Sequence, residues 1–176
     1  DLPEGKNLVG AFHQPSAIVI DIALLADLPD RERRAALGEA VKMAALGDER
    51  LFELLETRGA AIAAGDPSAM TDGSIAELVE RCSWAKIEIV AADEREAAVR
   101  IALNLGHSLG HAFEAAGGYR DLRHGEAVAY GLRAACRIGV AAEVASPDRA
   151  ARIERLLDGL GLGGGTLPYP LEAVLE

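Results

Sequence analysis

Apolar residues recur with the helical period along most of the chain. From about residue 31 onward they return every three to four positions, a spacing that predicts amphipathic α-helices. Asp, Ser or Pro at the start of these segments and Gly at their ends are typical helix boundaries. The expected helices span about 31–46, 48–65, a short turn opened by Asp66-Pro67, about 72–90, 97–116, 124–144 and 146–159, with a last helix beginning near 171.

The N-terminal residues follow a different pattern. Ala17-Ile18-Val19-Ile20-Asp21 is a short run rich in β-branched residues, and it is the best strand candidate in the chain. The predicted fold class is therefore mainly α with a short N-terminal strand element. We expect residues 1–21 to connect to another domain and residues 22–176 to form one helical domain. The polar start and the helical start at 171–176 indicate part of a larger protein.

Composition narrows the function classes. The 176 residues are 50% hydrophobic and carry a net charge of −10, which argues against nucleic-acid binding because phosphate recognition needs a basic surface. No apolar run approaches the length of a membrane span, and Asp1-Leu2-Pro3 does not resemble a signal peptide. Cys82 and Cys136 are isolated and are expected to be buried thiols, so a reducing, cytoplasmic setting is expected.

Polar residues line up in the segment expected to be the most buried helix. Arg100, Asn104, His107 and His111 are separated by four, three and four residues, which would place them on one stripe of a single helix. The remaining positions are mostly apolar, and such a helix should be buried. Buried polar groups without partners cost several kcal/mol, so the stripe should face something polar. The glycines before each histidine indicate close approach by a backbone or ligand.

Three histidines within eighteen residues favour a metal. Spacing alone makes His107, His111 and His124 the ligands, because a catalytic zinc takes three protein ligands and leaves a position open. Glu39, with Lys42 one turn later, offers a competing carboxylate ligand beside an anion-binding cation. Two plainer interpretations are histidines hydrogen-bonded in a helical core and a surface Glu39–Lys42 ion pair.

The motifs together resemble a known family. They are Gly38-Glu39-Ala40-Val41-Lys42, Lys86 with Asp93-Glu94-Arg95-Glu96, the Arg100–Ala112 run with its Asn-Leu-Gly-His-Ser-Leu-Gly-His core, and His124-Gly125-Glu126-Ala127-Val128. In this order they resemble the C-terminal domain of dehydroquinate synthase. The opening from Gly5 to Pro15 is similar to the segment that joins that family's two domains.

The resemblance implies a different ligand set from the one that spacing favours. It implies that zinc, or cobalt, is held by Glu39, His107 and His124, while His111 faces the substrate. The residues that match the family's substrate-binding positions are Lys6, Asn7, Lys42, Lys86, Arg100, Asn104 and His111. Among them His111, Lys42 and Asn104 are expected to act in catalysis. Cations suit the substrate's carboxylate and phosphate groups.

The implied reaction is that of a 3-dehydroquinate synthase in the shikimate pathway of aromatic amino acid biosynthesis. It converts 3-deoxy-arabino-heptulosonate 7-phosphate to 3-dehydroquinate and phosphate through NAD-dependent oxidation, phosphate elimination, reduction and aldol closure. NAD would be bound mostly by an N-terminal α/β domain outside this chain, in a homodimer. No residue here is assigned to NAD, since Gly161–Gly165 follows a helix rather than a strand. This chain alone is expected to be inactive.

Some features leave other functions open. Lys42-Met43-Ala44-Ala45 differs from the Lys-Tyr-Gly run usual in the family, and Ala98 stands where Gly is expected. Related sugar phosphate cyclases form amino-dehydroquinate, inosose or valiolone rings. The retained Asn104 and His111 favour dehydroquinate synthase over the last two of these. A zinc-binding helical domain without catalysis and an iron-dependent alcohol dehydrogenase domain are further alternatives.

Overall fold

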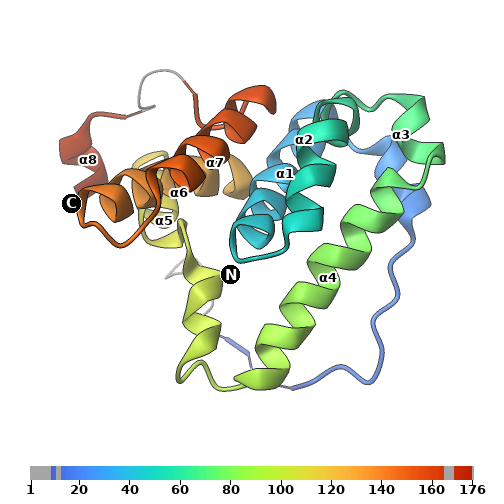
Figure 1. The fold of residues 1–176 in the computed structure, drawn as a ribbon, viewed down its shortest axis with the longest axis horizontal. Coiled ribbons are helices and arrows are strands. Elements are labelled where there is room, and N and C mark those ends of the chain that lie inside the picture. Colours follow the sequence, from blue (N-terminus) through green and yellow to red (C-terminus); the bar gives the residue numbers. More distant parts are fainter. Residues whose placement is uncertain (1–8, 11–12, 165–168, 176) are drawn as a thin grey trace.

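The chain folds into packed helices joined by short loops. The computed structural model describes residues 9–10, 13–164 and 169–175. Within them the elements follow one another as η1 (Ile22–Asp27), α1 (Asp30–Ala45), α2 (Glu49–Ala64), α3 (Pro67–Thr71), α4 (Ser74–Ala92), η2 (Val99–Asn104), α5 (His107–Ala116), α6 (His124–Ala141), α7 (Pro147–Gly159) and α8 (Leu171–Leu175). Figure 1 shows this arrangement. The mainly α fold class is confirmed.

Local signals set most helix boundaries within a few residues of the predicted ones. The Asp48 carboxylate accepts a hydrogen bond from the Leu51 amide at 2.8 Å and so caps α2. Gly65 ends that helix in the left-handed conformation, with φ +68°. Asp66 and Ser146 cap α3 and α7, each followed by a proline in the first turn. The helix after His124 ends at Ala141, three residues earlier than predicted.

The predicted strand at residues 17–21 is wrong. These residues form an irregular segment without regular secondary structure that leads into η1 (Figure 1). Ile18, Val19 and Ile20 are exposed, with 92% of Val19 accessible. A β-branched run forms a strand only when a neighbouring strand satisfies its backbone, and the described residues contain no strand to pair with it. The predicted division between residues 21 and 22 stays a prediction.

The predicted continuous helix over 97–116 is also wrong, because it breaks at Gly106. Residues 99–104 form the 3₁₀ helix η2, Leu105 is extended, and Gly106 has a left-handed φ of +78° before α5 begins. Val99 and Ile101 are more than half exposed, so the η2 half is not the buried helix that its apolar composition predicts. Arg100 and Asn104 therefore do not share a helical stripe with His107 and His111.

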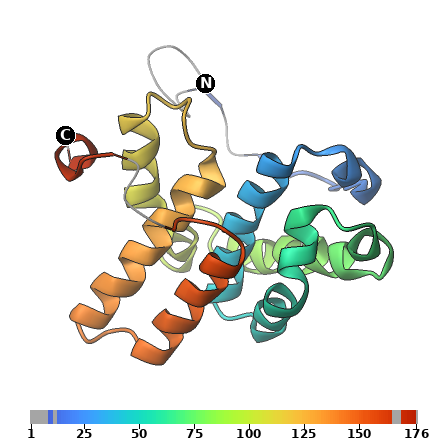
Figure 2. The same cartoon turned by 90° about the horizontal axis from the view of Figure 1, so that it is seen from above.

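Helix α1 lies at the centre of the domain. Figures 1 and 2 both show α2, α3 and α4 on one side of α1 and α5, α6 and α7 on the other. Helix α1 contacts α2, α4, α6 and α7. The main core lies among these helices and excludes water from its largest side chains: Leu37, Val41, Leu51, Leu55, Val128, Leu132, Leu157 and Leu162. A smaller cluster of Phe113, Ala127 and Val174 joins α5, α6 and α8.

Candidate metal and substrate site

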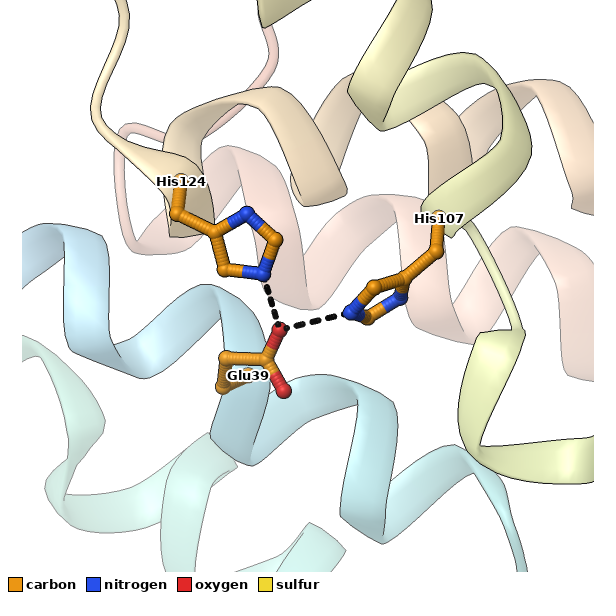
Figure 3. A group of neighbouring side chains, drawn as sticks. All are labelled: Glu39, His107 and His124. Atoms are coloured by element: carbon orange, nitrogen blue, oxygen red, sulfur yellow. Dashed lines mark ion pairs between the residues drawn. The ribbon is translucent and has the colours of Figure 1, made fainter. Parts of the chain in front are cut away.

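Three helices bring Glu39, His107 and His124 together. Glu39 lies in the middle of α1, while His107 and His124 are the first residues of α5 and α6. The Glu39 Oε1 atom lies 3.3 Å from His107 Nε2 and 3.2 Å from His124 Nε2. Figure 3 shows the carboxylate facing both rings. Oε1 is buried and has no hydrogen-bond partner among the described residues.

The hydrogen bonds of the two rings leave these three atoms suited to a cation. His107 Nδ1 lies 3.2 Å from the Leu105 carbonyl oxygen, and His124 Nδ1 lies 3.2 Å from both carboxylate oxygens of Glu114. Those oxygens are acceptors, so each Nδ1 carries the hydrogen and each Nε2 of a neutral imidazole is bare. Two nitrogen lone pairs then face an unpartnered carboxylate oxygen. A cation between them would turn this repulsion into attraction.

The separations also suit zinc. Zinc bonds of about 2.0–2.1 Å at tetrahedral angles place neighbouring ligand atoms about 3.4 Å apart. The distances of 3.3 and 3.2 Å from Glu39 Oε1 to the two nitrogens are close to that value. Three protein ligands leave a position for water or substrate. Glu39, His107 and His124 therefore fit a catalytic zinc, although the assignment itself stays a prediction.

A second group of possible ligand atoms is formed by His111, Glu114 and His124. Here the contacts are complete hydrogen bonds, because His111 Nδ1 lies 2.8 Å from Glu114 Oε2 and His124 Nδ1 lies 3.2 Å from the same oxygen. A metal there would have to displace both hydrogens. The chemistry of the donor atoms favours the group that contains Glu39.

Lys42 stands beside the metal group and affects its electrostatics. Its Nζ lies 2.6 Å from Glu39 Oε2, and its side chain is only 7% exposed, so the surface ion-pair interpretation is wrong. Burial raises the pKa of Glu39, but hydrogen bonds and positive charge from its neighbours, Lys42 among them, outweigh burial and lower the pKa to about 2. Glu39 is therefore an anion over the whole physiological pH range.

The site opens into a cavity of about 720 Å³ between α1, α4 and η2. Its polar end is lined by Glu39, Lys42, Lys86, Glu96, Arg100, Asn104, His107 and His124. Arg100 and Asn104 thus reach the same cavity as the metal group even though the single helical stripe is wrong. The cations there suit an anionic ligand.

Two hydrogen bonds to the α4–η2 loop orient the residues from η2. Arg100 Nη1 donates to the Glu94 carbonyl at 2.6 Å, and Asn104 Nδ2 donates to Glu96 Oε1 at 2.8 Å. The predicted Lys6 and Asn7 lie outside the described residues. His111 does not line the cavity. Its side chain is 48% exposed, and its ring stacks on that of His124 with centroids 5.6 Å apart.

Glu114, Glu96 and Asp93 were not predicted as site residues from the sequence. Glu114 is 5% exposed and contacts both His111 and His124. Its spacing of three from His111 on one helix was a usable signal. Glu96 and Asp93 stood in a quoted motif, but nothing in the pattern indicated that Asp93 would be buried and accept backbone hydrogen bonds.

Comparisons with known proteins agree with these features. A family model described as 3-dehydroquinate synthase C-terminal matches residues 36–176, and one described as 3-dehydroquinate synthase N-terminal matches residues 1–35. The 3-dehydroquinate synthase of Colwellia psychrerythraea is 44% identical over 91% of this chain, and that of Symbiobacterium thermophilum is 45% identical over 98%. The chain spans 44% and 46% of those relatives, slightly less than half their length.

A solved structure shows the same fold. The 2-epi-5-epi-valiolone synthase of Streptomyces hygroscopicus subsp. jinggangensis 5008, solved with NAD+ and Zn2+ bound, aligns with a TM-score of 0.83 and 26% identity. The alignment covers 98% of this chain and 47% of that one. Among the described residues no helix is both long enough and apolar enough to cross a bilayer. The resemblance predicted from the motifs is confirmed: the chain belongs to the 3-dehydroquinate synthase family.

Proposed function

We propose that this chain supplies the zinc site and much of the substrate site of a 3-dehydroquinate synthase. The observation that carries the proposal is the convergence of Glu39 Oε1 with the bare Nε2 atoms of His107 and His124 at the polar end of a cavity. The relatives at 44–45% identity bear the name of that enzyme. The substrate is then 3-deoxy-arabino-heptulosonate 7-phosphate, and the products are 3-dehydroquinate and phosphate.

The cofactors of the proposal are zinc and NAD, both of which the related valiolone synthase binds. Zinc, when bound, would polarise the substrate hydroxyl that is oxidised, and NAD would accept and return the hydride. The NAD domain is proposed to precede this chain, in a homodimer. The chain's own contribution is to hold the metal with three side chains and to present cations to the substrate.

The residues that line the cavity, together with His111, Lys6 and Asn7, have different proposed roles in binding the substrate. Lys42, Lys86 and Arg100 supply positive charge around the cavity, which suits the carboxylate and phosphate of a sugar acid phosphate. Asn104, whose amide is oriented by Glu96, would hydrogen-bond a substrate hydroxyl. His111, held through Nδ1 by Glu114, would exchange a proton with the substrate or orient its phosphate. Lys6 and Asn7 complete the proposed substrate set.

A second candidate is a sugar phosphate cyclase of the valiolone type. The structural match to a valiolone synthase favours it, as does the Met43-Ala44-Ala45 sequence after Lys42. The two candidates differ in whether the substrate bears a carboxylate. Phosphate release from the carboxylated and uncarboxylated seven-carbon sugar phosphates, compared at equal concentrations, separates them.

The experiment uses the full-length protein and measures zinc content and phosphate release together. His107→Ala should lose both, while His13→Ala is the matched control because His13 is exposed and lies outside the cavity. Normal zinc stoichiometry in His107→Ala would overturn the ligand set. Iron in the purified protein, with oxidation of simple alcohols, would point instead to the alcohol dehydrogenase alternative.

A further inference from the structure

A buried carboxylate joins the exposed His111 to the half-buried His124. Glu114 lies on α5, one turn after His111, and only 5% of it is exposed. Its Oε2 lies 2.8 Å from His111 Nδ1 and 3.2 Å from His124 Nδ1, while its Oε1 lies 3.2 Å from His124 Nδ1. One carboxylate therefore contacts a proposed metal ligand from α6 and a proposed substrate-facing histidine from α5.

These contacts fix which nitrogen of each ring carries the hydrogen. A carboxylate accepts hydrogen bonds, so both histidines donate through Nδ1 and keep Nε2 bare when the rings are neutral. For His124 the bare Nε2 is the atom that lies 3.2 Å from Glu39 Oε1. A histidine that binds a metal through one nitrogen is commonly held by an acceptor at the other nitrogen, which sets both its tautomer and its orientation.

We propose that Glu114 is a positioning residue, which holds His124 in the tautomer and orientation that bind the metal and holds His111 beside it. The inference rests on the metal site of the proposed function and extends it to a residue outside the ligand set. Through the shared Oε2 atom, the position of the metal ligand His124 is tied to that of His111. The two rings stack with an interplanar angle of 27°.

Glu114 does not fit the role of a metal ligand itself. Its oxygens contact the Nδ1 side of His124, whereas Glu39 faces the Nε2 side of the same ring. One ion cannot bind both nitrogens of one imidazole, because the two lone pairs point to different sides of the ring. A metal bound with Glu39 and His107 leaves Glu114 on the far side of His124.

The test compares two isosteric carboxylate-to-amide variants of the full-length protein. Glu114→Gln keeps the size of the side chain but offers one acceptor oxygen and places an NH₂ group beside a ring nitrogen. Asp93→Asn is the matched control, since Asp93 is also buried but accepts its hydrogen bonds from three backbone amides. Zinc affinity is measured for each metal-free protein by titration with zinc against a chelator.

A positioning role predicts that Glu114→Gln binds one zinc about 10–100-fold more weakly than the unmodified protein. The zinc affinity of Asp93→Asn should stay within about twofold of that of the unmodified protein, a change well below the loss expected for Glu114→Gln. Substituted cobalt should show a changed visible absorption spectrum in Glu114→Gln only, because His124 is then held differently. Unchanged zinc affinity and cobalt spectrum in Glu114→Gln would overturn the inference while leaving the proposed function intact. Complete loss of zinc from Glu114→Gln, with zinc retained in Glu39→Gln, would make Glu114 a ligand and overturn it as well.

A second measurement uses the unmodified protein, so its result does not depend on whether a variant folds. Nitrogen-15 NMR of the metal-free, unmodified protein, labelled at histidine, reports the tautomer of each ring. His111 and His124 should both carry the hydrogen on Nδ1. An Nε2–H tautomer at His124 would overturn the inference even if the protein binds zinc. Failure of the unmodified protein to bind zinc at all would remove the proposed function together with the inference.

Discussion

The backbone of Gly38 in α1 lies directly against the carbonyl group of Gly125 in α6. A Cβ atom added to Gly38 would overlap the Gly125 carbonyl oxygen, and one added to Gly125 would overlap the Ala35 carbonyl oxygen. Gly38 precedes Glu39 and Gly125 follows His124. The close approach of the two helices is therefore what brings these two proposed ligands within reach of one ion.

The first prediction concerns this helix contact. Gly125→Ala should lower the free energy of unfolding of the metal-free protein by about 2–3 kcal/mol, because the methyl group overlaps a backbone carbonyl that cannot move independently. Zinc affinity should fall too, since Glu39 and His124 would be pushed apart. Urea denaturation and zinc titration measure the two effects.

The matched control is Gly159→Ala at the exposed end of α7. An added Cβ there meets nothing within 4 Å, so stability should stay the same or rise by up to about 1 kcal/mol through better helix propensity. If Gly125→Ala were as stable as Gly159→Ala, the close helix contact would not determine the geometry of the site.

The second prediction concerns an ion pair that ties α1 to the beginning of α6. Arg31 donates from Nε and Nη2 to the two oxygens of Glu126 at 2.8 and 2.7 Å. Glu126 Oε2 also accepts the Arg123 amide hydrogen at 2.9 Å, just before His124. Glu126→Gln should therefore lower the free energy of unfolding by about 0.5–1 kcal/mol. This is the upper range for a partly exposed ion pair with two parallel hydrogen bonds.

The pH dependence of this pair has a definite sign. Burial raises the pKa of Glu126, but the hydrogen bonds from Arg31 and the Arg123 amide, together with the charges of the two arginines, outweigh burial and lower the pKa below 4.5. A carboxyl group whose pKa is lower in the folded than in the unfolded protein stabilises the fold at pH values above the unfolded-state pKa. This stabilisation is lost as the pH falls through the folded-state pKa. The stability difference between the parent and Glu126→Gln should shrink as the pH falls below about 4.5. A difference that stayed constant down to pH about 2 would contradict the assignment.

The sequence predicted the helices well because their boundaries depend on local chemistry. Asp48, Asp66 and Ser146 each accept an amide hydrogen at the start of a helix, as the pattern predicted. The strand at 17–21 failed because a strand depends on a distant partner, which no local pattern supplies. The predicted helical stripe of Arg100, Asn104, His107 and His111 is wrong because the helix is interrupted at Gly106. The apolar period continues through this position, but Gly106 has a left-handed conformation.

The site was only partly accessible to sequence reasoning. Spacing alone favoured His111 as a metal ligand, whereas the structure places Glu39 between His107 and His124. That arrangement depends on the glycine contact between α1 and α6, which joins residues far apart in the chain. Glu39 was predicted as a metal ligand through the family resemblance of the motif that contains it. Glu114 was missed because its importance also depends on burial and on contact with His124, a residue of another helix.

The third prediction concerns the cysteines. Burial raises the pKa of the Cys82 thiol to about 12, and burial also raises the pKa of Cys136. The thiolate is the reactive form, so both residues should be protonated at pH about 8. Alkylation by iodoacetamide, followed by mass spectrometry, should be at least about tenfold slower in the folded protein than in urea. Because Cys82 lines the cavity, rapid native alkylation there would show that its thiol is ionised and contradict the expected protonation.

The last prediction concerns Asp93, which holds the loop before η2. Its Oδ1 accepts the Ala97 amide hydrogen at 2.9 Å, and its Oδ2 accepts those of Ala98 at 2.7 Å and Arg100 at 3.1 Å. These backbone hydrogen bonds, with that of Ala97 the largest, lower the pKa of Asp93 below 3.8. The carboxylate thus fixes the backbone from which Arg100 enters the cavity.

Asp93→Asn keeps the shape of the side chain but cannot accept all three hydrogen bonds, because its NH₂ group is a donor. Arg100 should then be less well placed, which raises the KM for the sugar phosphate about tenfold, the cost of a misplaced charged hydrogen bond of about 1.4 kcal/mol. Steady-state phosphate release by the full-length protein measures KM and kcat separately. Since the hydrogen bonds of Asp93 come from backbone amides and not from a proposed metal ligand, zinc content should not change. An unchanged KM would show that Arg100 does not depend on this loop, and a loss of zinc would show that Asp93 supports the whole site instead of its substrate-binding half.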